Sequence, residues 1–175
     1  MKFFIVIIYI FTLTKFSLAQ VEAPNYSFEL SQLDIFMPQK PIADVIKKFP
    51  KIKEIKTKNN LQAYLVYIDY RRYKFPVYIQ VKDKLITDFY AKLPQYFLHN
   101  IFHFSLIKKW GMQTSYKKVE EQAVYIWKKD DITIIYSGAC TITCFPVYLT
   151  IMKSDIKKSL MKLFFDNELS MLPNS

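Results

Sequence analysis

Glycine is nearly absent from this chain, which has two glycines, Gly111 and Gly138, in 175 residues. Loops that bring backbone amides close to a phosphate or an oxyanion usually need residues without a Cβ atom. The sequence therefore contains neither a phosphate-cradling glycine loop nor a nucleophile elbow. Carboxylates placed by a catalytic motif are missing too, because Asp130–Asp131 and Glu120–Glu121 are better interpreted as a turn and a solvated segment. The sequence favours a non-catalytic protein and indicates no cofactor.

Cysteine is equally scarce, with Cys140 and Cys144 as the only two. This count excludes a disulfide-dense scaffold, and the spacing fits no zinc-finger, iron–sulfur or haem-attachment motif. In one straight strand the two Cα atoms would lie about 13 Å apart, beyond the roughly 7 Å limit for a bridge, so a disulfide requires a turn. Because Gly138 makes such a turn credible and exported proteins are oxidised by default, we predict a structural Cys140–Cys144 disulfide.

Only two histidines occur, His99 and His103, four residues apart in a predicted helix. This spacing places both imidazoles on one side of the helix, where they could supply two ligands of a metal site. A third ligand is missing, and the same side carries Leu106 and Trp110, which indicates packing. The two histidines are therefore the candidates for a metal, but no metal site is predicted.

The first 19 residues have the pattern of a secretory signal peptide. Lys2 precedes an apolar run over residues 3–13, and Ser17 and Ala19 suit the cleavage pocket of a signal peptidase. The run is too short to span roughly 30 Å of hydrocarbon as a helix, and no later window is long enough either. We expect export to the periplasm or outside after cleavage near Ala19, with an uncleaved anchor as the alternative, and no transmembrane segment in the mature chain.

The formal net charge of +10 comes almost entirely from lysine, since Arg71 and Arg72 are the only arginines. A nucleic-acid reader would concentrate arginines and aromatic residues in one element, whereas these lysines are dispersed in pairs. We therefore expect no nucleic-acid partner. Scattered charge does raise the potential near an acidic surface, so anionic lipid and surface polysaccharide are alternative partners beside a protein or another envelope component.

The predicted elements follow an irregular lead-in over residues 20–40. Pro41 opens a short helix over 42–49, and Gly111 ends the longest helix, over 95–110. Alternating or continuous apolar runs predict the strands. The strands cover residues 61–70, 77–82, 85–90, 123–127, 132–136 and 144–152, and a last helix covers 155–165.

An internal repeat is indicated by three matches in the same order. The clearest is the identical tetrapeptide Phe75–Tyr78 and Phe145–Tyr148. Colinear matches on equivalent elements are typical of a duplicated unit. We therefore predict an α+β fold in which two helix-then-three-strand repeats, residues 41–93 and 94–152, pack an antiparallel sheet against helices. With the short C-terminal helix they form a single domain over residues 41–175.

This layout resembles the BLIP/SmpA-like repeat of beta-lactamase inhibitor proteins and small outer-membrane assembly lipoproteins. The local similarities are Trp110–Gly111 and Tyr125–Trp127, whereas the lipidated cysteine of the assembly proteins is absent. The resemblance implies a sheet surface that faces protein partners and a fold without a catalytic centre. It implies no particular binding residue.

Tyrosines crowd one predicted hairpin beside the two arginines. Tyrosine and arginine are the side chains that interfaces concentrate. We expect an exported binding or envelope-assembly module that uses an aromatic sheet face. The alternatives are a small secreted hydrolase with a dispersed active site around His99 or His103, and a periplasmic lipid-binding protein. The candidate binding surface comprises Tyr70, Arg71, Arg72, Tyr73 and Tyr78.

Overall fold

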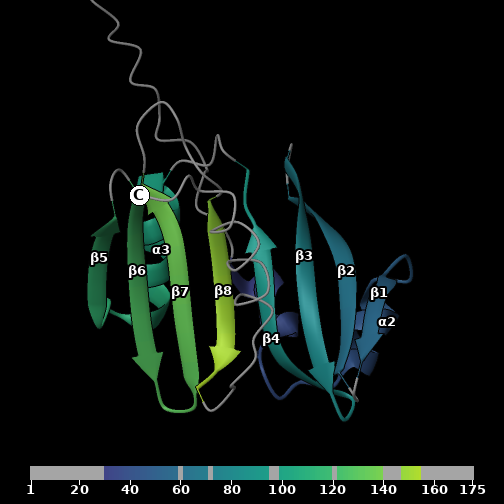
Figure 1. The fold of residues 1–175 in the computed structure, drawn as a ribbon. Coiled ribbons are helices and arrows are strands. Elements are labelled where there is room, and N and C mark those ends of the chain that lie inside the picture. Colours follow the sequence, from purple (N-terminus) through teal and green to yellow (C-terminus); the bar gives the residue numbers. More distant parts are fainter. Residues whose placement is uncertain are drawn as a thin grey trace, which may run out of the picture.

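The computed structural model describes residues 30–58, 61–70, 73–94, 99–119, 122–139 and 147–154 (Figure 1). In these ranges the chain forms one antiparallel sheet of eight strands and three short helices. The helices lie behind the sheet in the view of Figure 1, and the front face carries no described helix. None of the described helices is long and apolar enough to cross a bilayer.

The sheet consists of two four-stranded meanders. Its strand order is β1-β2-β3-β4-β8-β7-β6-β5, so the last strand of each meander, β4 or β8, pairs with the other in the middle of the sheet. The two first strands, β1 and β5, form its edges. The bounds are β1 Lys53–Lys58, β2 Leu61–Tyr70, β3 Tyr73–Lys82, β4 Leu85–Lys92, β5 Ser115–Val119, β6 Gln122–Lys129, β7 Ile132–Ala139 and β8 Tyr148–Lys153.

The predicted fold class is wrong. The chain is mainly an antiparallel sheet of eight strands with short helices, and not an α+β fold made of two helix-then-three-strand repeats. The sequence analysis missed β1 (KEIKTK) and β5 (SYKKV), which read as polar connecting segments. Lysine is depleted in strands in general, but it is favoured on edge strands because its charge prevents pairing with another chain. Both missed strands are edges, and for this reason they lack the apolar pattern.

Pro76 lies inside β3 without interrupting the sheet. It pairs with Tyr67 of β2, but the ladder between β3 and β4 begins only at Val77, opposite Ala91. A proline has no N–H to donate and is tolerated where no ladder bond is needed. Because Pro76 lies just beyond the end of the β3–β4 ladder, its missing donor costs no bond there.

The three helices differ in how the sequence specifies them. The helix α2 (Ile42–Lys48) follows Pro41, which is its N-cap and is extended at φ −70° and ψ 136°. The helix α3 (His99–Trp110) ends at Gly111, whose φ of +78° is the left-handed conformation that glycine adopts readily. The 3-10 helix η1 (Leu30–Phe36) forms within the expected irregular lead-in, where it buries Leu30, Leu33 and Phe36.

The core lies between the sheet and these helices. From Tyr64 on β2 and from Phe75 on β3, every second side chain points toward the helices and is buried, as the period of two in a strand requires. Each large apolar side chain buried in this way contributes about 1.5–3 kcal/mol. The largest side chains removed from solvent in this core are Trp127, Tyr136, Phe36, Phe75, Phe89, Phe102, Ile79, Ile86, Leu106, Ile134 and Leu149, whereas Tyr148 is buried on the opposite face of the sheet.

Several predictions concern residues outside the described ranges. These are the signal peptide over residues 1–19, the Cys140–Cys144 disulfide, the helix over residues 155–165, and the side chains of Arg71 and Arg72. They stay predictions.

Candidate functional site

The structure divides the predicted tyrosine surface between two faces of the sheet. Tyr70 is buried toward the helices, as part of the core. Tyr78 is half-buried and lies on the front face, where it pairs with Leu65. Tyr73 belongs to β3, at the start of the strand. The two tyrosines whose side chains are described therefore cannot contact the same partner surface.

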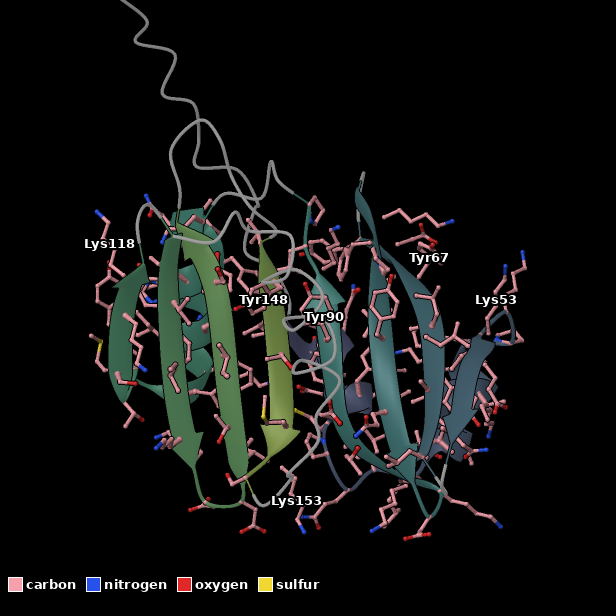
Figure 2. All side chains as sticks on the ribbon, in the orientation of Figure 1. Lys53, Tyr67, Tyr90, Lys118, Tyr148 and Lys153 are labelled. Atoms are coloured by element: carbon pink, nitrogen blue, oxygen red, sulfur yellow. The ribbon has the colours of Figure 1, made fainter. Side chains whose placement is uncertain are left out.

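Among the aromatic side chains of the β2–β3 hairpin that the structure describes, Tyr67 is the most exposed. Half of its surface (50%) is open to solvent, and it lies on the front face beside Pro76 (Figure 2). The ammonium of Lys74 sits 5.6 Å from the centre of its ring. Such a cation–π pair holds the ring in place and adds a positive charge beside an apolar surface.

A row of tyrosines continues from this hairpin to the middle of the sheet. The rings of Tyr78 and Tyr90 are 6.2 Å apart, and those of Tyr90 and Tyr148 are stacked at 5.4 Å. The row runs across β3, β4 and β8, because the ladders pair Tyr78 with Tyr90 and place Tyr148 two residues from Thr150, the partner of Tyr90, on the same face. We call Tyr67, Tyr78, Tyr90 and Tyr148 the tyrosine row. Burial, and then the neighbouring Tyr67, raises the pKa of the Tyr78 phenol, which therefore stays protonated.

The central part of the front face is buried although no described helix covers it. Tyr90 and Tyr148 are 3% and 2% exposed, and Asp88, two residues before Tyr90 on β4, is fully buried. The Thr87 hydroxyl lies 2.8 Å from Asp88 Oδ1, and the Thr150 hydroxyl donates to the Phe89 carbonyl at 2.7 Å. Only the flanks of the front face are therefore open to a partner, and the Tyr67 flank is the aromatic one.

The histidines predicted on one side of a helix do lie together, against β6 and β7. Their rings are stacked, 5.5 Å apart and 13° from parallel. His99 Nδ1 lies 3.1 Å from the Tyr136 hydroxyl, and its Nε2 lies 3.5 Å from the Tyr125 hydroxyl. The His103 ring packs 4.0 Å from that of Tyr125. The two imidazoles are thus packed among tyrosines. The sequence predicted such packing, because Leu106 and Trp110 lie on the same side of the helix.

The electrostatics of this cluster favour neutral imidazoles. Burial lowers the pKa of His99, and the neighbouring His103 lowers it further. Burial also lowers the pKa of His103, although the nearby side chain of Gln113 opposes the shift. Among the described residues no third histidine, cysteine or carboxylate joins the two rings to complete a metal site. Tyr125 and Tyr136 do not offer a ready phenolate, because burial raises both of their pKa values.

Gly138 makes room for the tyrosine that contacts His99. A Cβ atom at Gly138 would lie 2.0 Å from the Tyr136 hydroxyl oxygen, so the ring of Tyr136 occupies the space that a side chain would fill. Tyr136, Tyr125 and Tyr67 were not among the predicted site residues. Strand alternation could have predicted two of them, because it places Tyr67 on the outer face of the sheet and Tyr136 on the inner face. The sequence offered no sign of the Gly138 contact.

A separate open groove of about 520 Å³ lies at the opposite end of α3. Neither histidine lines it, so the described residues do not combine the histidines and the acidic turn into one cleft. Its lining residues are Gln39, Lys109, Trp110, Lys129, Asp130, Asp131 and Ile132.

Comparisons with known proteins identify no family for this chain. No protein-family model matches the chain, and no curated protein matches it. Among solved structures the chain is similar to a DUF4309 family protein (YjgB) from Bacillus subtilis, with 12% sequence identity, 67% of this chain and 81% of that chain covered, and a TM-score of 0.42. A likeness of this size carries no conclusion about function. Since no comparison connects the chain with BLIP/SmpA-like repeats, that resemblance stays a prediction.

Proposed function

We propose that this chain is an exported, non-catalytic binding module that recognises a protein partner through the open flank of the sheet face that no described helix covers. The flank comprises Leu65, Tyr67, Lys74, Pro76 and Tyr78. The observation that carries the proposal is the half-exposed ring of Tyr67 with the Lys74 ammonium above it.

Strand pairing holds the residues of the flank in a rigid arrangement. The strands β2 and β3 are paired along their whole length, from Leu61 opposite Lys82 to Tyr70 opposite Tyr73. A tyrosine on a rigid strand loses little conformational freedom when it is covered, and it presents both an apolar ring and a hydroxyl. Such residues are typical centres of protein interfaces. Exposed Lys74 favours a partner with a carboxylate or a carbonyl oxygen beside an apolar contact.

Site-specific photocrosslinking tests this proposal with a matched control. A benzophenone amino acid replaces Tyr67 in one variant and Tyr116 in another, and both are expressed in the organism's own cells. Tyr116 is 49% exposed, but it lies on β5 and contacts Tyr125 on the helix side of the sheet. We expect a discrete crosslinked protein from position 67 and none from position 116. Equal products from the two positions, or none from position 67, would contradict the proposal.

Affinity measurements with the crosslinked partner provide the second test. Replacing Tyr67 with Ser should weaken binding about tenfold or more, because truncation of a central aromatic residue typically costs more than about 1 kcal/mol. Replacing Tyr116 with Ser should leave the affinity unchanged. Both variants should unfold at the same temperature as the unmodified protein, since neither ring belongs to the core.

A further inference from the structure

The helix α3 is attached to the sheet by an unusual set of side chains. Its core-facing stripe consists of His99, Phe102, His103 and Leu106, at the spacing of one helical face. Phe102 and Leu106 are fully buried, and the two histidines complete the contact with β6 and β7. The other α-helix, α2, makes its contact through apolar residues, with Ile42 and Val45 buried. Half of the stripe of α3 is therefore titratable, whereas that of α2 is not.

The described surroundings of the two imidazoles offer no carboxylate that would stabilise a positive charge by ion pairing. Tyr116 of β5, Tyr125 of β6 and Tyr136 of β7 are the titratable groups around the pair, and Gln113 follows the helix. The charged groups of α3 itself are cations, Lys108 and Lys109 in its last turn. Within the described ranges no carboxylate forms an ion pair with either ring.

Two buried polar atoms beside the pair lack a hydrogen-bond partner. His103 Nε2 and Gln113 Oε1 are both removed from solvent, and neither has a partner of good geometry among the described atoms. A protonated imidazole needs two acceptors, since both of its nitrogens then carry hydrogen. Two adjacent rings 5.5 Å apart would also repel each other once both are charged.

We propose that the His99–His103 pair is an acid-sensitive latch, which holds α3 on the sheet while both rings are neutral and loosens it when they become protonated. The latch should weaken as the pH falls, because both histidine pKa values are shifted downward in the folded protein. Both pKa values lie below the ordinary 6.5 in the folded protein, so the unfolded or detached helix takes up protons first as the pH falls. The contribution of the latch to stability is complete above about pH 6.5 and is lost progressively below it. Release of α3 would uncover the aromatic surface of Tyr125, Tyr136 and Trp127.

The latch is tested by hydrogen exchange of the full chain at pH 7.5 and pH 5.5, after correction for the intrinsic rates. We expect the amides of α3 to lose about tenfold or more of their protection at the lower pH, the factor that one unit of pKa difference produces. The amides of α2 should keep theirs. A histidine-dependent change in α3 can be assigned to this pair, because the chain contains no other histidine. Equal changes in the two helices, or no change in α3, would overturn the proposal.

A variant and a direct titration complete the test. In the double variant H99Q/H103Q the response of α3 to pH should disappear, and a response that persists would contradict the latch. If this variant does not fold, the two imidazole signals of the unmodified protein decide by NMR titration. Midpoints clearly below 6.5 support the latch, and midpoints at or above that value exclude it.

Discussion

The hydroxyl of Tyr136 lies 3.1 Å from Nδ1 of His99, and this contact joins the middle of β7 to the first turn of α3. The two rings are also stacked, 5.6 Å apart and 7° from parallel. Because Tyr136 is fully buried, its hydroxyl has no access to water as a substitute partner. The contact is therefore both an anchor for the helix and the orienting partner of one imidazole.

Replacing Tyr136 with Phe should lower the free energy of unfolding at pH 7.5 by about 1 kcal/mol. The ring remains in place, but His99 loses a hydrogen-bond partner in a partly buried site. Urea unfolding measures the change. The control is Tyr125→Phe, which removes a longer contact of 3.5 Å and should cost less. An equal or larger loss for the control would show that the Tyr136 hydroxyl is not the important partner.

Replacing Gly138 with Ala should destabilise the protein by about 1–3 kcal/mol through overpacking. The new methyl group would overlap the Tyr136 hydroxyl and push the ring away from His99. The imidazole NMR signals of His99 should shift as a result. Gly111→Ala is the control, since its Cβ would meet nothing within 4 Å and the cost arises only from the positive φ. Equal losses of stability in the two variants, together with unchanged His99 signals in both, would refute the overlap.

Replacing Trp127 with Phe should cost about 1–3 kcal/mol, through a smaller buried ring and a lost hydrogen bond. The indole Nε1 donates to the Gly111 carbonyl at 2.8 Å and so fastens the end of α3 to β6. Thermal unfolding measures the loss. Trp110→Phe is the matched control, because Trp110 is only partly buried, and it should cost less. The prediction fails if the two variants have the same stability.

Chemical modification of tyrosine should distinguish the open flank from the covered centre of the front face. With N-acetylimidazole and peptide mass spectrometry, Tyr67 and Tyr116 should react readily, since about half of each is exposed (50% and 49%). Tyr90 and Tyr148 should react only when the protein unfolds. Early modification of Tyr90 would mean that the centre of the face is open, and the proposed partner would then have a larger surface to bind.

The sequence predicted the interior strands because their patterns are strong. Apolar residues alternate or run together through β2, β3, β4, β6 and β7, and the predicted ranges for these strands agree with the structure to within a few residues. It missed the lysine-rich β1 and β5, whose identity as strands depends on a neighbour to pair with. It also missed η1, whose three buried side chains follow no long period.

For the candidate site, the sequence brought His99 and His103 together, because a spacing of four residues defines one helical face wherever the helix lies. It could not supply their partners, Tyr125 and Tyr136, since these come from two other strands and reach the histidines only through the packing of α3. The placement of Tyr70 and Tyr78 on opposite faces of the sheet likewise depends on tertiary packing. Which face of β2 and β3 meets the helices is decided by the whole sheet and not by the hairpin.

The amino-acid sequence by itself thus determined the local elements and the scarcity of glycine, cysteine and histidine, because periodicity and composition act over a few neighbouring residues. Only the tertiary structure decided which strands are edges, which tyrosines stay open to solvent and which groups surround the histidine pair. These features depend on contacts between residues far apart in the chain, whose free energies arise only when the sheet and helices pack together.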